Sequence, residues 1–493
     1  MTVALLATSA RPAHAAWAGG GRDAILAEID TSTDATLGFA TGDMRAPASL
    51  FGHTFIIFHG VDGPQPDSPL LEFAGDVRRG ADHFRAVFTR IPGRFQLTHL
   101  SHKQREYATE GRSLWLYPLR LDAARHAQLR ALARDASRRP SDYTFLRFNC
   151  SHHLLDLIAR AAGLERSAPE WPHVTPEQTL RWLDRAGLLG MPRFVPAPRY
   201  VASHAMTALR PTEQRQTEAL LAGLQQLGDA TPVSVAQAAA AAAGDLILQA
   251  DDPFERHRLL RLRADAPTPA APPLPPQPLQ AAGDRLIGVL VDAERERALL
   301  SARLGFRGLE RQGDAIGGFA LIEYGAVDLL ARRNEARVTR VALVNMESTQ
   351  PASRLASDFT QVLRLQYLDD SAWLRRSARQ VELGFGRGLS TGNASVALSA
   401  LPVFSLRWVR LESADGVDLS LSMRTVLAWT PTSAWRVRAS GEWGVVNADQ
   451  ARRRLAVEAR WAPLRPIGVS AVYSRQGDAA AGELAGVRLS LLF

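Results

Sequence analysis

Residues 417–429 read VDLSLSMRTVLAW and alternate between apolar and polar side chains. One set of alternate positions is mostly large and apolar, and comprises Val417, Leu419, Leu421, Met423, Leu427 and Trp429. The other set holds Asp418, Ser420, Ser422 and Arg424. A period of two residues is that of a β-strand, because successive side chains point to opposite faces of a sheet. The stretch therefore predicts a long strand with one apolar face and one polar face.

The same pattern recurs in residues 434–446 and 453–461, where apolar positions alternate with arginine, serine and glutamate. A tilted strand needs about 9–11 residues to cross a bilayer core, and these runs have that length. Tryptophans stand near the strand ends, as in an aromatic girdle. The chain finishes with apolar residues at alternate positions, which resembles the C-terminal signal of bacterial outer-membrane barrels: Val487, Leu489, Leu491 and Phe493. We expect an outer-membrane barrel of about 10–12 strands; a soluble β-sandwich or half-barrel, which alternates similarly, is the alternative.

The chain divides into five segments by composition and period. Residues 1–16 contain an apolar run that ends in Ala-His-Ala, and are expected to be the remnant of a signal peptide. Residues 17–205 mix short strands with amphipathic helices and predict an α+β domain. Residues 206–263 predict a helical connector, and residues 264–283 form a proline-rich linker. Residues 284–493 make up the all-β antiparallel barrel or barrel-like domain.

The composition is that of a globular protein, with 46% hydrophobic and 22% charged residues, so wholesale disorder is excluded. The net charge of +8 is carried by arginine, because Lys103 is the single lysine. Arginines are interleaved with acidic residues along the chain, and we expect no nucleic-acid partner. Contact with an anionic lipid surface accounts for the charge equally well. The sequence has no apolar run long enough for a transmembrane helix.

Cys150 is the only cysteine, so it forms no internal disulfide. In an exported protein a free thiol is a liability unless it is buried or used. It stands where an extended run becomes a helix, and Asn149 is expected to cap that helix. The helix dipole and free N–H groups of the first turn would stabilise a thiolate there, and could also receive an oxyanion.

Histidines and one carboxylate complete the candidate site. His53 begins a predicted buried strand and is the candidate base for the thiol proton. Glu72, on the next strand, is expected to orient the second ring nitrogen. His152 and His153 are expected to pack against the helix or to line a substrate cleft. A metal is not expected, because one thiol and two histidines at positions i, i+2 and i+3 of a helix do not converge on a tetrahedral ion; no cofactor motif is present.

Each of these residues also has an ordinary structural interpretation. A lone cysteine is most often a small buried hydrophobic residue, and a histidine on an apolar strand usually serves packing. Glu72 fits a polar strand position as well as an orienting role. The residues alone therefore leave a thiol enzyme and an inert module both open.

A family resemblance favours the first interpretation. Residues 36–164 resemble the Lnb N-terminal periplasmic domain family of bacterial envelope proteins. The shared motifs are Ser-x-Phe-Gly-His-Thr at 49–54, Leu-Glu-Phe-Ala-Gly-Asp at 71–76, Pro-Gly-Arg-Phe at 92–95, Lys-x-x-Glu at 103–106 and Tyr-x-Phe-x-x-x-Asn-Cys at 143–150. The Asn-Cys-x-His element also resembles permuted papain-like thiol enzymes, in which the histidine precedes the cysteine. The resemblance implies a permuted papain-like fold with His53 as base and Cys150 as nucleophile.

The implied function is that of a cell-envelope Cys–His acyltransferase or hydrolase that acts through a thioester on an acyl ester or amide. Lipid or lipoprotein is the favoured substrate, and a peptidoglycan amidase or peptidase is an alternative. A non-catalytic outer-membrane protein with a periplasmic binding module is the alternative from another class. We expect the N-terminal domain in the periplasm and the C-terminal domain in the outer membrane.

Overall fold

The computed structural model divides the chain into two compact units, Met1–Leu274 and Pro275–Phe493. The division falls within the predicted proline-rich linker, while the finer domain boundaries stay predictions. The structure describes residues 20–42, 51–77, 86, 89–144, 148–164, 175–280, 285–307, 320–333, 335–349, 360–369, 378–392, 396–411, 415–432, 434–446, 450–464, 466–476 and 483–492. The predicted signal-peptide remnant, residues 1–16, and Phe493 lie outside these ranges.

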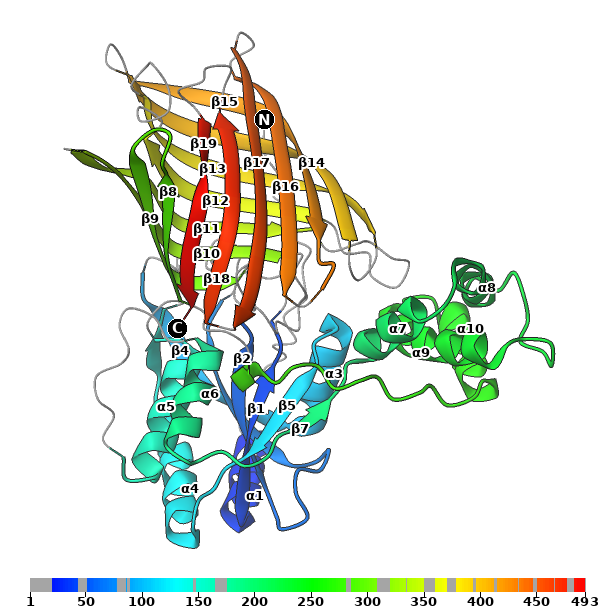
Figure 1. Cartoon of the computed structure of the whole chain (residues 1–493). Coiled ribbons are helices and arrows are strands. Elements are labelled where there is room, and N and C mark those ends of the chain that lie inside the picture. Colours follow the sequence, from blue (N-terminus) through cyan, green and yellow to red (C-terminus); the bar gives the residue numbers. More distant parts are fainter. Residues whose placement is uncertain are drawn as a thin grey trace. The chain divides into compact units, whose positions relative to one another are not determined.

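The N-terminal unit is built on an antiparallel sheet with seven strands among the described residues, in the order β6-β4-β3-β2-β1-β5-β7. The strands are β1 (Asp34–Ala40), β2 (His53–His59), β3 (Pro69–Gly75), β4 (Ile91–His99), β5 (Leu114–Pro118), β6 (Ser141–Tyr143) and β7 (Arg193–Val195). The sheet and its helices form the blue and cyan part of Figure 1.

Helices cover this sheet and continue beyond it. They are α1 (Gly20–Thr31), α3 (Leu100–Glu110), α4 (Ala123–Ser137), α5 (Cys150–Ala161), α6 (Pro176–Arg185), α7 (Pro198–Thr207), α8 (Pro211–Leu221), α9 (Val233–Gln249) and α10 (Pro253–Asp265). Helices α7 to α10 cover the predicted helical connector. Helix α9 contains the alanine-rich stretch, and its alanines are buried because their small side chains let neighbouring helices approach closely. No helix in the described part of the chain is long and apolar enough to cross a membrane.

Strand β2 is buried on both faces, which explains its nearly continuous apolar sequence HTFIIFH. Phe55 and Ile57 lie in a core cluster with Leu100 and Tyr107 of helix α3. Thr54, which has the opposite parity, lies within hydrogen-bonding distance of Ser151 of helix α5, with 3.4 Å between the hydroxyl oxygens. The first residues of β2 therefore lie between elements from both faces of the sheet.

The C-terminal unit is a closed antiparallel barrel of twelve strands among the described residues. Strand β19 closes it by pairing with β8, for example Leu489 with Val289. The strands are β8 (Leu286–Asp292), β9 (Arg297–Arg307), β10 (Ala320–Arg332), β11 (Glu335–Ser348), β12 (Thr360–Asp369), β13 (Ala378–Gly392), β14 (Val396–Leu411), β15 (Asp415–Trp429), β16 (Trp435–Val446), β17 (Gln450–Leu464), β18 (Ile467–Gln476) and β19 (Glu483–Leu492). A short 3-10 turn, η2 (Pro278–Gln280), precedes β8. The α+β unit followed by a closed barrel confirms the predicted fold class, whereas the permuted papain-like connectivity stays a prediction.

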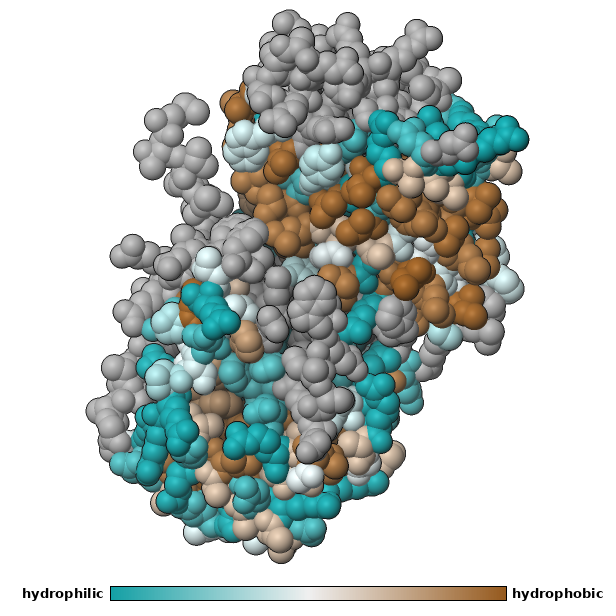
Figure 2. All heavy atoms as spheres, turned by 90° about the vertical axis from the view of Figure 1, so that its left-hand side faces the viewer, coloured by the Kyte–Doolittle hydropathy of each residue, from teal (hydrophilic) through white to brown (hydrophobic). Residues whose placement is uncertain are grey.

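The barrel has its apolar residues outside and its polar residues inside. On β15, Leu419 is 67% exposed whereas its neighbour Ser420 is 7% exposed. Figure 2 shows an apolar surface of this kind on the viewed side of the barrel. The soluble-sandwich alternative is wrong, because a sandwich would bury the apolar face between two sheets instead of exposing it.

Tryptophans mark both ends of the outer surface. Trp429, Trp435 and Trp461 lie near one end of β15, β16 and β17, and the rings of Trp435 and Trp461 are 6.5 Å apart. Trp408 and Trp443 lie near the opposite end of their strands. All five side chains are exposed. Such girdles at the two interfaces are typical of outer-membrane barrels.

Candidate thiol active site

Cys150 is the first residue of helix α5, where the sequence predicts it. Asn149 has the extended backbone of an N-cap, with φ −91° and ψ −176°, and its side-chain oxygen accepts a hydrogen bond from the His152 N–H at 3.0 Å. Buried leucines such as Leu154 and Leu157 hold the helix against the core. The thiol is consequently fixed at the positive end of the helix dipole.

His53, the first residue of β2, lies close enough to the Cys150 thiol for side-chain hydrogen bonding and for its charge to act on the sulfur. Two other groups contact the sulfur: the backbone of Thr54, and the Ser151 hydroxyl, whose oxygen is 3.8 Å from Sγ. The structure therefore brings together the predicted base and the predicted nucleophile, although they are 97 residues apart in the chain. The adjacent pair Thr54 and Ser151 has the same separation in sequence.

Glu72 lies behind the histidine on strand β3. Its Oε2 is 3.1 Å from Nε2 of His53. Because Nε2 faces Glu72, Nδ1 is the ring nitrogen left for the thiol. The other carboxylate oxygen, Oε1, is 2.7 Å from Nζ of Lys103 on helix α3. The four side chains thus form a chain of contacts from Lys103 through Glu72 and His53 to Cys150, called the thiol relay below.

The relay is largely removed from solvent. The side chains of His53, Glu72 and Lys103 are 20%, 5% and 12% exposed. Charged groups rarely stay buried unless they are paired, because the loss of hydration must be offset by partners. Here each carboxylate oxygen of Glu72 meets one cationic or proton-donating group.

Burial raises the pKa of the Cys150 thiol, but the charge of His53 and the hydrogen bonds to the sulfur outweigh burial and lower the pKa to about 7. Burial likewise lowers the pKa of His53, while Cys150 and Glu72 outweigh it and raise the pKa to about 9. A histidine pKa above the cysteine pKa favours the thiolate–imidazolium pair near neutral pH. This pair is the reactive form of a cysteine nucleophile.

Lys103 keeps the rest of the relay charged. Burial opposes the ionisation of Glu72, yet the Lys103 charge and the His53 hydrogen bond outweigh it and lower the pKa of Glu72 to about 2. The same ion pair outweighs burial at Lys103 and raises the pKa of its ammonium group. Lys103 also pairs with Glu106 at 2.8 Å.

Sequence reasoning gave Lys103 no role in the site. One signal was present, because a chain with 58 basic residues has a single lysine, and that lysine stands in the Lys-x-x-Glu motif. Lysine offers a compact charge on a flexible stem, which suits a buried carboxylate that has only one free oxygen.

The other predicted site histidines pack beside the relay. The ring of His153 lies on Phe73, with 3.8 Å between centroids, and its Nε2 is 3.1 Å from the Asp142 carbonyl oxygen. The ring of His152 meets Phe148 edge-on, with 5.2 Å between centroids. These contacts hold both rings in place, and a role of either residue in a substrate cleft stays a prediction.

Fold and site together define a class of protein: an α+β domain with a cysteine–histidine pair joined to a membrane-type β-barrel. Residues 23–185 match the family model described as Lnb N-terminal periplasmic domain. This match confirms the resemblance seen in the sequence and extends it at both ends. The chain therefore has its N-terminal domain in the periplasm and its C-terminal barrel in the outer membrane. Within the described residues, no three or more histidine, cysteine, aspartate or glutamate side chains are placed to hold a metal ion.

Solved structures similar to this chain are outer-membrane barrels. They include the NanC porin (9% identity, 42% of this chain and 98% of that one, TM-score 0.27) and a loop-deletion mutant of OmpT from Vibrio cholerae (9%, 43% and 98%, 0.19). An anion-selective porin from Comamonas acidovorans is a third (10%, 43% and 98%, 0.19). These scores are low, so the barrel assignment rests on the strand pairing itself. No curated protein matches the chain.

Proposed function

We propose that the N-terminal domain is a cysteine–histidine acyltransferase or hydrolase of the bacterial envelope, which acts on an acyl ester or amide of a lipid or lipoprotein. The thiol relay is the observation that carries this proposal. A protein that needed only a buried cysteine would have no use for three buried charged groups leading to it, because burying them is costly. A nucleophile held as a thiolate at neutral pH does need them.

The reaction follows from the positions of the side chains. Nδ1 of His53 takes the thiol proton, and Sγ of Cys150 forms a bond to the acyl carbonyl carbon, whose electron pair moves to oxygen. When the carbonyl re-forms, the bond from carbon to the leaving oxygen or nitrogen breaks, and His53 returns the proton to the leaving group. Water or an amine then attacks the thioester, loses its proton to His53, and releases the thiol.

Two features support the roles of the surrounding groups. N–H groups of the first turn of α5 lie beside the sulfur, where charge develops on the carbonyl oxygen. Glu72 accepts a hydrogen bond from the Nε2–H of His53, which fixes the ring orientation and stabilises the imidazolium that forms during the reaction. The lipid preference is supported by the barrel, because a domain tethered to a membrane meets acylated lipids and lipoproteins at high local concentration.

Intact-mass spectrometry of the full-length protein tests the proposal. The protein is incubated in detergent or liposomes with phospholipid, lipopeptide or muropeptide, and wild type is compared with Cys150→Ser and His53→Ala. We expect an acyl adduct on wild type, whose mass identifies the donor, no adduct on Cys150→Ser, and a slowed adduct on His53→Ala. His59→Ala is the matched control, because His59 lies on the same strand but bonds to Thr36 instead.

Other outcomes change the conclusion in defined ways. An adduct from muropeptide alone would replace the lipid substrate by peptidoglycan. A wild-type protein that forms no adduct, and whose Cys150 resists alkylation until the protein unfolds, would overturn the enzyme and favour a non-catalytic binding module.

A further inference from the structure

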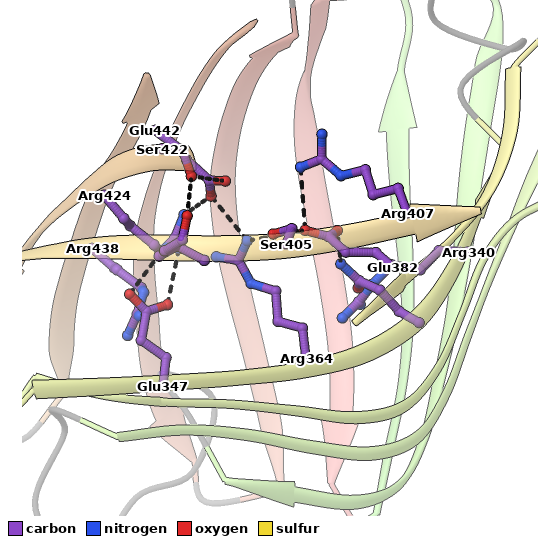
Figure 3. A network of polar contacts seen from close by, with 12 residues as sticks. Arg340, Glu347, Arg364, Glu382, Ser405, Arg407, Ser422, Arg424, Arg438 and Glu442 are labelled. Carbon is purple, nitrogen blue, oxygen red and sulfur yellow. Dashed lines mark hydrogen bonds and ion pairs between the residues drawn. The ribbon is translucent and has the colours of Figure 1, made fainter. Parts of the chain in front are cut away.

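The interior of the barrel contains ion pairs that reach from one wall to the other. Figure 3 shows arginine and glutamate side chains from several strands pointing toward one another inside the barrel. Arg364 on β12 pairs with Glu442 on β16, with 3.0 Å between Nη1 and Oε2. Three strands, β13 to β15, separate these two along the wall. The contact is therefore made across the lumen.

A second crossing lies beside the first. Glu347 on β11 pairs with both Arg424 on β15 and Arg438 on β16, each at 2.8 Å. Arg424 also reaches Glu442 at 3.2 Å, so the two crossings are joined. The joined pairs link β11 and β12 with β15 and β16.

A third carboxylate, Glu382 on β13, connects neighbouring strands of the wall between the ends of the two crossings. It accepts a hydrogen bond from Gln366 at 3.0 Å and one from the Ser405 hydroxyl at 2.9 Å. It also pairs with Arg407 at 3.3 Å. Gln366 in turn accepts a hydrogen bond from Arg340 at 2.9 Å, which extends the network along the wall. These seven charged residues are called the ionic layer below: Glu347, Arg364, Glu382, Arg407, Arg424, Arg438 and Glu442.

The carboxylates of the ionic layer are buried. The side chains of Glu347, Glu382 and Glu442 are 2%, 0% and 6% exposed, although they lie in the middle of a barrel and not in an apolar core. In an open pore such carboxylates would be hydrated. Their burial means that neighbouring side chains fill the lumen at this level.

The strand number explains why ion pairs are needed for this. A barrel of about eight strands is narrow enough for single side chains to fill, while barrels of about 16–18 strands leave an aqueous channel. Twelve strands enclose an intermediate width. An arginine and a glutamate placed end to end can span it, and their pairing offsets the loss of hydration.

We propose that the ionic layer closes the barrel to ions and solutes, so that the barrel anchors the N-terminal domain in the membrane and is not an open pore. The layer has four arginines and three glutamates. Neutralising the glutamates leaves arginines that repel one another across the lumen, which opens the layer and lines the opening with positive charge. The opened barrel then prefers anions.

Conductance across planar lipid bilayers tests this with the full-length protein. Wild type is compared with the double variant Glu347→Gln, Glu442→Gln, under a potassium chloride gradient. We expect no conductance steps from wild type, steps at least tenfold above background from the double variant, and a reversal potential displaced toward that of chloride. Glu335→Gln is the matched control, because Glu335 lies at the start of the same strand as Glu347 but is 54% exposed and pairs with Arg337, two residues along the strand.

The wild-type recording needs no substitution, so it tests the proposal even if a variant fails to fold. Porin-like steps from wild-type protein would overturn the proposal. A double variant that retains the heat-modifiable migration of a folded barrel yet stays as silent as wild type would overturn it as well. Cation-selective steps would contradict the assignment of the excess charge to the arginines.

Discussion

Both units of this protein bury charged side chains, but they do so in opposite settings. In the N-terminal unit, the thiol relay is a short line of partners beside an apolar core, and it ends at the single cysteine. In the barrel, charges fill the interior and apolar residues cover the outside. We infer from this difference that buried charge points to a reactive site where it is local and directed at a reactive atom, as in the proposed site at Cys150.

The two clusters also differ in redundancy, that is, in how many cationic partners each buried carboxylate has. Oε1 of Glu72 has Lys103 as its close cationic partner, and Oε2 faces His53. Glu347 instead has two arginine partners, and Glu442 has Arg364 and Arg424. Loss of one partner should therefore be severe in the relay and mild in the layer. Of the five predictions that follow, the substitutions of Lys103 and Arg438 test this contrast and the others test each unit separately, beginning with the largest expected effect.

Lys103→Met should have the largest effect. It leaves Glu72 as a buried carboxylate without its ammonium partner, and breaking a buried pair in this way costs about 3–5 kcal/mol. Adduct formation should also fall by more than tenfold, because Glu72 no longer holds His53 in place. The loss of stability is measured as a shift in the guanidinium midpoint for unfolding of the N-terminal unit. Pulse proteolysis reports the unfolded fraction at each guanidinium concentration.

Arg438→Met is the comparison in the ionic layer. Glu347 keeps Arg424 after this change, so the cost to the barrel should be well below that of Lys103→Met in its own unit. Equal losses at the two sites would contradict the expected difference in redundancy.

Lys103→Arg is the control for Lys103→Met. It retains the positive charge and should keep most of the stability that Lys103→Met loses.

Leu421→Arg tests the outward face of the barrel. Leu421 lies at the middle of β15 and is exposed, so the substituted side chain would face the centre of the bilayer. Arginine at that depth destabilises a barrel by about 2–4 kcal/mol, and by about 0–1 kcal/mol near the interface. Val417→Arg, close to the strand end, is the matched control. Equal effects of the two variants on unfolding in liposomes would contradict a membrane position for this face.

The sequence was sufficient for some of these features because they depend on local pattern. Alternation along 417–429 determines which side chains face outward, whatever the neighbouring strands are. Asn149 and Cys150 were identifiable because a cap and a first helical residue are adjacent in the chain. The motif around His53 supplied the base by resemblance.

Contacts between distant segments could not be read in this way. Lys103 reaches Glu72 only because helix α3 packs on the face of the sheet that carries Glu72, and no spacing in the sequence specifies that packing. The pairing of Arg364 with Glu442 depends on the closure of the barrel between β8 and β19. Strand pattern gives the inward direction of each residue but not its partner across the lumen.

The pH profile of thiol alkylation separates the relay from an inert cysteine. With a pKa of about 7, half of the Cys150 thiol is ionised at pH 7. In His53→Ala the positive charge is lost, so the pKa should rise toward its ordinary value, and alkylation at pH 7 should fall by about tenfold. Labelling with iodoacetamide between pH 5 and pH 10 measures the midpoint. His59→Ala should keep the midpoint near 7, and an unchanged midpoint in His53→Ala would contradict the proposed pair.

Asn149→Ala should have the smallest effect, and it separates stability from reactivity within one helix turn. The change removes the acceptor of the His152 N–H, and loss of such a cap costs about 1 kcal/mol. Thiol reactivity should change less than twofold, because the helix dipole and His53 still act on the sulfur. Asn149→Asp should show the reverse, since it keeps the cap but places a negative charge beside Cys150 and raises the thiol pKa. If both variants altered thiol reactivity and helix stability in proportion, the two properties could not be separated. The Asn149 cap would then stabilise the thiolate as well as the helix.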